Sequence, residues 1–145
     1  MAELRVLSGR EASIFACLTD TVVAPEPALP PVRETDAVRF FDEWLALLPA
    51  PNRAGMRALL WAAELAPLAA GFGGRLRRLE RSRRTEWLRG VEHAPLTQLS
   101  LLAKLMVSAA QLSYYGSDAV LGIVGYDARA NLERGRRLRA AEGRP

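Results

Sequence analysis

The chain has few residues of the kinds that usually form a catalytic or metal centre. It contains one cysteine, Cys17, and one histidine, His93. A single cysteine excludes an internal disulfide framework and a four-cysteine zinc site. A single histidine excludes a metal centre built on a histidine pair, including the HExxH motif.

Signals for β-strands are also scarce. No long run alternates apolar and polar residues, and no Asn-Gly or Asp-Gly pair marks a hairpin. Apolar residues recur instead at helical spacing, and 145 residues suit a single domain. The sequence therefore predicts an all-α fold: one compact domain of five to six helices over residues 1–127, and a basic, loosely held tail over residues 128–145.

Targeting and membrane segments are not evident. The first residues show no apolar core beside a charged region and no twin arginine. The most apolar stretch, residues 96–115, contains polar side chains such as Lys104 and Gln111 that are costly in lipid. We therefore expect no membrane span and a cytoplasmic location.

The first helix has a clear start and a clear end. Ser8 and Glu11 have the spacing of a capping box, in which each side chain bonds the backbone amide of the other residue. An apolar stripe follows at helical spacing: Ile14, Phe15, Leu18 and Val22. Pro25 predicts the end of this helix. Residues 24–34 hold four prolines and predict a stiff, proline-rich connector.

Two later segments are apolar over most of their surface. In residues 36–48 the polar side forms a narrow stripe: Arg39, Asp42, Glu43 and Ala46. Such a wide apolar arc predicts a central helix buried on two sides. In residues 96–115 the polar groups form a thin seam: Thr97, Ser100, Lys104, Ser108, Gln111 and Tyr115. We interpret this segment as a buried helix, whose seam faces solvent, a ligand pocket or a partner groove.

Turn residues divide the rest of the chain. Asn52 is a plausible cap for a third helix that Pro67 ends or kinks. The segment 75–91 forms a fourth helix that ends near Gly90, and residues 118–124 form a short helix closed by Gly125.

The basic residues are concentrated in two places. Residues 71–89 carry seven arginines and two glutamates, and residues 129–145 have a net charge of +4. The first cluster has three interpretations: a solvated face, a docking surface for an acidic protein, or a nucleic-acid site. It lacks a helix-turn-helix pattern and an aromatic stacking platform.

The single histidine and the single cysteine each have a structural interpretation as well as a functional one. His93 could be a general base beside Glu92, or a surface or helix-capping residue. Cys17 could be reactive, or a small buried hydrophobic residue near the apolar stripe of the first helix. Since no nucleophile motif or matched carboxylate pair accompanies them, we place no catalytic, cofactor-binding or metal-binding residue in this chain.

Two stretches together resemble a known family. Residues 7–11 (LSGRE) lead to residues 18–25 (LTDTVVAP), and residues 113–120 (SYYGSDAV) end at residues 125–127 (GYD). Their order and spacing are similar to those of the gluconate 2-dehydrogenase subunit 3 family. The resemblance spans about residues 7–127, and similar helical segments precede the flavin domain of long-chain alcohol oxidases of the glucose-methanol-choline (GMC) class.

This resemblance implies a non-catalytic small subunit. It would bind and stabilise a larger FAD-dependent GMC-type oxidoreductase that acts on an alcohol, sugar or sterol, with the FAD in the partner and no cofactor in this chain. Many family members carry a twin-arginine signal, and its lack here favours an intracellular complex. The partner interface is predicted at six residues: Arg83, Arg84, Trp87, Tyr114, Tyr115 and Tyr126. For the three tyrosines, packing in the core with a bonded hydroxyl is an equal alternative. The alternative is a basic helical module that binds nucleic acid or another anionic partner, and a third hypothesis is a small-molecule binder that uses the seam.

Overall fold

The computed structural model describes residues 4–23 and 28–141. In these residues the fold is all-α, as the sequence predicts, with more helices than the five or six expected. The α-helices are α1 (Gly9–Val23), α2 (Ala37–Leu47), α3 (Ala50–Ala69), α4 (Arg81–Glu92), α5 (Thr97–Tyr115), α6 (Asp118–Val124) and α7 (Ala128–Ala141). Two short 3-10 helices, η1 (Val32–Glu34) and η2 (Leu76–Arg78), precede α2 and α4. No helix in the described part of the chain has the length and apolar character needed to cross a membrane.

The start of α1 is the predicted capping box. The amide and hydroxyl of Ser8 both donate to the Glu11 carboxylate at 2.8 Å, and the Glu11 amide donates to Ser8 Oγ at 3.3 Å. The helix ends at Val23. Pro25 and the first part of the proline-rich connector lie outside the described residues. The last three residues of the connector form η1.

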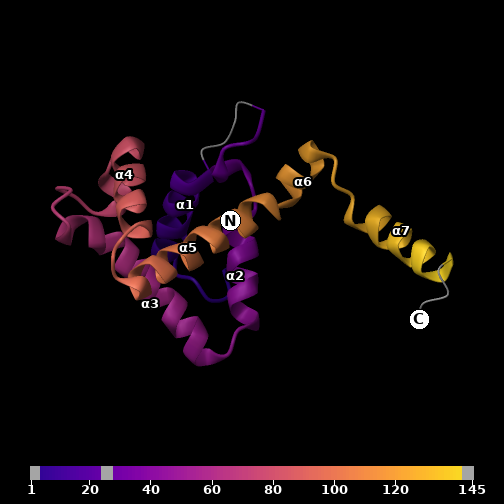
Figure 1. Ribbon diagram of the computed structural model, residues 1–145, viewed down its shortest axis with the longest axis horizontal. Coiled ribbons are helices and arrows are strands. Elements are labelled where there is room, and N and C mark those ends of the chain that lie inside the picture. Colours follow the sequence, from indigo (N-terminus) through magenta and orange to yellow (C-terminus); the bar gives the residue numbers. More distant parts are fainter. Residues whose placement is uncertain (1–3, 24–27, 142–145) are drawn as a thin grey trace.

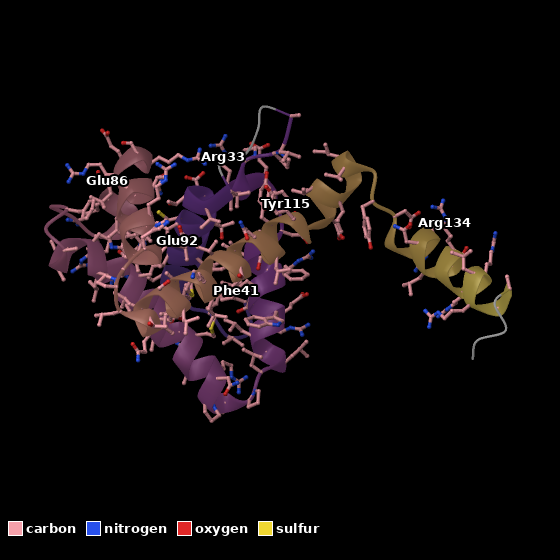
Figure 2. The ribbon with its side chains drawn as sticks, in the orientation of Figure 1. Arg33, Phe41, Glu86, Glu92, Tyr115 and Arg134 are labelled. Carbon is pink, nitrogen blue, oxygen red and sulfur yellow. The ribbon has the colours of Figure 1, made fainter. Side chains whose placement is uncertain are left out.

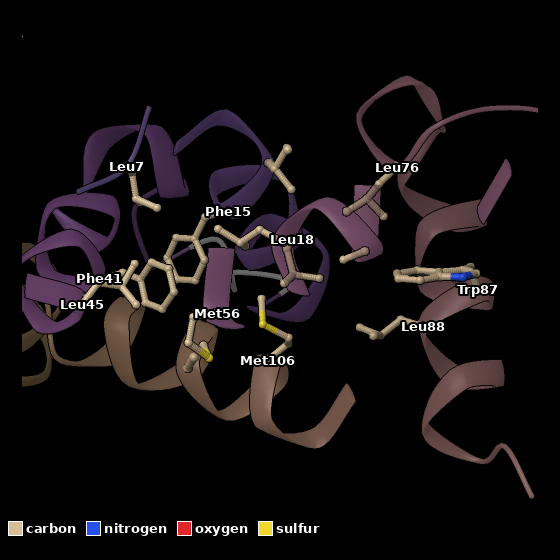
Figure 3. Packing of buried hydrophobic residues seen from close by; sticks show 14 residues of the cluster. Leu7, Phe15, Leu18, Phe41, Leu45, Met56, Leu76, Trp87, Leu88 and Met106 are labelled. Atoms are coloured by element: carbon tan, nitrogen blue, oxygen red, sulfur yellow. The ribbon is translucent and has the colours of Figure 1, made fainter. Parts of the chain in front are cut away.

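Helix α1 occupies the centre of the fold, in place of the α2 segment for which the sequence predicted that position. It packs against α2, α3, α4 and α5 (Figure 1). The rings of Phe15 on α1 and Phe41 on α2 are stacked, with centroids 3.8 Å apart. Met106 of α5 and Trp87 of α4 extend the same core (Figure 3).

Helix boundaries differ from the predictions in three places. Helix α3 begins at Ala50 with Pro49 as its N-cap, so Asn52 lies inside the helix and does not cap it. Pro67 does not end α3, because the amide of Ala70 still bonds the carbonyl of Ala66 and the helix continues to Ala69. The predicted helix over residues 75–91 is divided into η2 and α4, and Gly90 lies inside α4. The turn before η2 has glycines with positive φ at 71 and 73, where other residues would be strained.

The C-terminal part of the chain extends away from this core. Val120 of α6 is buried beside Tyr114, whereas α7 lies apart from the other helices (Figure 1). Gly125 closes α6 with a left-handed φ of 72°, as the sequence predicts. The tail beyond residue 127 therefore begins with a regular helix that includes Gly135.

Candidate functional site

Helix α2 is rotated relative to the sequence prediction. Asp42, predicted on the solvent stripe, is only 1% exposed. Its carboxylate accepts bonds from the amides of Arg5, Val6 and Leu7 at 2.7, 3.0 and 2.8 Å. With Asp42 held inward, the aromatic residues Phe40 and Trp44 lie exposed on the other side of α2. The prediction of burial on two sides is therefore wrong for this helix.

Helix α5 is buried on one side and exposed on the other. Ala103, Met106, Ala110 and Tyr114 point into the fold. Leu105 and Leu112, predicted to be buried, are 45% and 69% exposed. The outer side of α5 thus exposes leucines beside the expected polar seam: Leu99, Leu101, Leu102, Leu105 and Leu112.

These exposed side chains surround three adjoining hollows. The first, of about 600 Å³, lies between α2, α3 and α5 and is lined by Trp44, Met56 and Leu105 among others. The second hollow shares Trp44 and Leu105 with the first, and the third shares Phe40, Trp44 and Leu112 with the second. We call their exposed apolar lining the apolar face: Phe40, Trp44, Leu102, Leu105, Leu112 and Tyr115.

The apolar face offers little polar chemistry. Among the described residues that line the first hollow, Asn52 is the one with an amide or charged side chain. Three members of the predicted seam, Ser108, Gln111 and Tyr115, lie along the third hollow. A small-molecule site usually adds several converging polar groups to its apolar walls. A continuous apolar surface of this kind is more typical of a protein–protein interface.

The structure corrects part of the predicted partner interface. Trp87 is 5% exposed and packs in the main core, and Tyr114 is fully buried with its hydroxyl bonded to the Pro30 carbonyl at 2.6 Å. Burial raises the pKa of the Tyr114 hydroxyl. Both side chains therefore serve the packing of this chain, and neither is exposed on its surface. Tyr115 belongs to the apolar face and lies at the C-terminal end of α5 (Figure 2).

The other predicted interface residues are divided between interior and surface. Arg84 is mostly buried and pairs with Asp20 at 3.0 Å, so it is also a packing residue. Arg83 is exposed, with its guanidinium 5.4 Å from the Phe72 ring centroid. Tyr126 is exposed in the loop after α6. The interface prediction therefore remains open for Arg83, Tyr115 and Tyr126.

The arginine cluster of residues 75–89 is partly used inside the fold. Besides the Arg84 pair, Arg77 bonds the buried carboxylate of Glu64 at 3.1 Å. Arg81 donates to the Asp20 carbonyl at 2.6 Å. These contacts attach η2 and α4 to α1 and α3. The two ion pairs neutralise two of the seven arginines on which a nucleic-acid interpretation of this segment depends.

The single histidine and the single cysteine both contact other residues of this chain. His93 is exposed at the C-terminal cap of α4, where its Nδ1 lies 2.8 Å from the Arg89 carbonyl oxygen. Cys17 is half-buried beside the Arg84 guanidinium, and burial raises the pKa of its thiol. Within residues 4–23 and 28–141, no group of three or more His, Cys, Asp or Glu side chains could hold a metal ion.

Comparison with other proteins adds no relative. No protein-family model, curated protein or solved structure matches the chain. The apolar face therefore rests on its geometry alone as the candidate site.

Five of the six residues of the apolar face were not predicted as site residues. Phe40, Trp44, Leu102 and Leu105 were assigned to a core, and Leu112 with them, whereas Tyr115 was predicted at the interface. The composition of residues 36–48 and 96–115 already indicated this exposed face. Each has more apolar surface than a helix of a small domain can bury, and the excess indicates contact with another molecule.

Proposed function

We propose that this chain is a non-catalytic small subunit that binds and stabilises a larger protein through the apolar face. The main support for this proposal is the apolar face itself. Six large apolar side chains from α2 and α5 are exposed around three connected hollows. Isolated soluble proteins rarely expose large continuous apolar patches, because water contact with them is unfavourable. A partner that covers the face would remove that cost.

The resemblance of residues 7–127 supports a particular class of partner. On that basis the partner is a larger FAD-dependent oxidoreductase of the GMC class that acts on an alcohol, sugar or sterol. In this proposal the partner holds the FAD and carries out the reaction, and the two chains form a hetero-oligomer in the cytoplasm. The small subunit contributes stability to the complex.

The proposal can be tested by purifying the tagged chain from its native host. We expect a larger partner in roughly equal amount, identified by mass spectrometry as a GMC-type flavoprotein, with the yellow absorbance of bound flavin. The double variant Leu105→Glu/Leu112→Glu should lose this partner, because it places two charges in the apolar face. Both leucines are exposed, so the variant should fold.

A matched control uses another exposed leucine. Leu68, near the end of α3, is 51% exposed and does not line the three hollows. The variant Leu68→Glu should retain the partner. Recovery of the chain alone, or equal recovery of the flavoprotein with both variants, would contradict the proposal.

Nucleic-acid binding is the second candidate, and one observation favours it. Helix α7 carries five exposed arginines and one glutamate. This function predicts a gel shift with duplex DNA or RNA at low salt that weakens steeply as salt is added. A chain that causes no shift at low salt would exclude it.

A further inference from the structure

Helix α7 lacks the burial that normally stabilises a helix of its length. It has 14 residues, and every side chain described in it is exposed. Isolated helices this short are marginal in water, and Gly135 weakens this one further. The helix does have a local start signal, since Asp127 accepts bonds from the amides of Arg129 and Ala130 at 2.9 and 3.0 Å. A helix with an N-cap but no buried side chain is expected to pack against another molecule.

The charge of α7 specifies part of that molecule's chemistry. Its arginines are Arg129, Arg134, Arg136, Arg137 and Arg139. The ion pair on the helix, Arg137 with Glu133, has a long separation of 4.0 Å and is highly exposed. Figure 2 shows Arg134 on α7, away from the packed helices. A surface that covers α7 must therefore be acidic.

A second copy of this chain is poorly suited to that role. Four carboxylates of its N-terminal half already have partners inside the fold: Glu11, Asp20, Asp42 and Glu64. They are consequently not available to bind five arginines of another copy. Of the exposed glutamates, Glu34 pairs with Arg33, Glu43 lies one helical turn from Arg39, and Glu80 and Glu86 lie among the arginines of residues 75–89. We therefore place the acidic surface on a different macromolecule.

Apolar side chains accompany the arginines and favour a protein over a nucleic acid. Ile123, Val124, Tyr126, Leu132 and Leu138 are all more than half exposed. A phosphate backbone attracts the arginines but gives aliphatic side chains nothing to pack against. A protein surface that joins acidic and apolar groups would contact both kinds of residue.

We propose that residues 123–141, which we call the C-terminal arm, bind an acidic patch on the same flavoprotein that covers the apolar face. This inference rests on the proposed function. The arm begins at α6, which follows the end of α5 where Tyr115 closes the apolar face (Figure 1). One partner can therefore contact both surfaces, with apolar contacts at the face and charge attraction at the arm.

The test measures binding rates between the full chain and the flavoprotein recovered with it, over a range of salt concentrations. The arm variant is Arg134→Gln/Arg136→Gln/Arg139→Gln, which keeps good helix formers. We expect its association rate at low salt to fall about tenfold, and its salt dependence to flatten, because charged residues at an interface accelerate encounter. A control variant, Arg33→Gln/Arg78→Gln/Arg89→Gln, removes the same charge from exposed positions outside the arm and should associate nearly as fast as the wild type.

The outcomes separate this inference from the proposed function. If the arm variant associates at the wild-type rate, or no more slowly than the control, the arm does not bind the partner, although the apolar face still can. If the arm variant loses binding to a duplex oligonucleotide while its flavoprotein kinetics are unchanged, the arm is a nucleic-acid element. If the wild-type chain binds no flavoprotein at all, the proposed function fails and this inference fails with it.

Discussion

At the residue scale, buried carboxylates hold distant parts of the chain together. Glu11 belongs to the capping box of α1. Its carboxylate also accepts hydrogen bonds from two residues of α3, Arg57 at 2.9 Å and the Trp61 indole at 3.3 Å. Its side chain is 2% exposed, whereas that of Arg57 is 45% exposed. A residue that the sequence assigns to a local cap therefore also joins two helices.

The environment of Glu11 sets a pH dependence for the stability of the fold. Burial alone would raise the pKa of Glu11, but the bonds from Arg57 and Ser8 together outweigh it and lower the pKa from 4.5 to about 2. An acid whose pKa is lowered on folding contributes stability above its unfolded pKa and loses that contribution as the pH falls toward its folded pKa. A lowering of this size is worth about 3 kcal/mol.

We therefore expect the free energy of unfolding to fall by about 3 kcal/mol through this group as the pH drops from about 5 to about 2. Urea unfolding at a series of pH values measures this quantity. The variant Glu11→Gln should be less stable at neutral pH and should lack this part of the acid dependence. Glu86→Gln, which alters an exposed carboxylate on α4 (Figure 2), serves as the control and should keep the wild-type profile. Equal acid dependence in wild type and Glu11→Gln would contradict the assignment.

At the scale of elements, the sequence predicts where helices begin and end better than which way they face. The capping box of α1 and the left-handed glycine after α6 are local signals, so both could be found from neighbouring residues. The orientation of α2 depends on hydrogen bonds that Asp42 accepts from amides 35 to 37 residues earlier in the chain. No local pattern reveals such a contact, and a stripe shared with Arg39 and Glu43 resembles a solvent face.

The same limit affected the predicted interface. Tyr114 was predicted at the interface because tyrosines suit interfaces, with core packing as an equal alternative, and Trp87 also belonged to the side of its segment that could be buried. Both residues complete the packing of this domain. Leu105 and Leu112 were placed inside because apolar residues usually are. Which of the available apolar groups fill the core is decided by the packing of whole helices, and the remainder form the exposed face.

Asp42 provides a direct test of what orients α2. Asp42→Asn removes the charge and part of the accepting capacity for the amides of residues 5–7, and it should lower the free energy of unfolding by about 2 kcal/mol. Glu43→Gln alters the neighbouring, exposed carboxylate and should change stability by less than about 0.5 kcal/mol. Chemical denaturation of both variants gives the comparison. Similar stability of Asp42→Asn and the wild type would show that these bonds do not orient the helix.

At the scale of the whole molecule, two surfaces lack the covering that a self-contained domain would give them. The apolar face exposes Trp44, Leu105 and Leu112 on one side of the packed helices. The C-terminal arm extends beyond them with exposed arginines and leucines (Figure 1). The interior contains stacked aromatic rings and paired carboxylates. A stable core with uncovered outer surfaces is what we expect of a subunit that completes its burial in a complex.

Docking of a larger flavoprotein on the apolar face is tested most directly by amide hydrogen exchange on the chain alone and in the complex. We expect slower exchange on binding in α2, in the first half of α3 and along α5, with further protection of α7. Helix α4, which lines none of the three hollows, should exchange at the same rate in both states. Protection concentrated in α4, with α2 and α5 unchanged, would place the interface elsewhere and contradict the account.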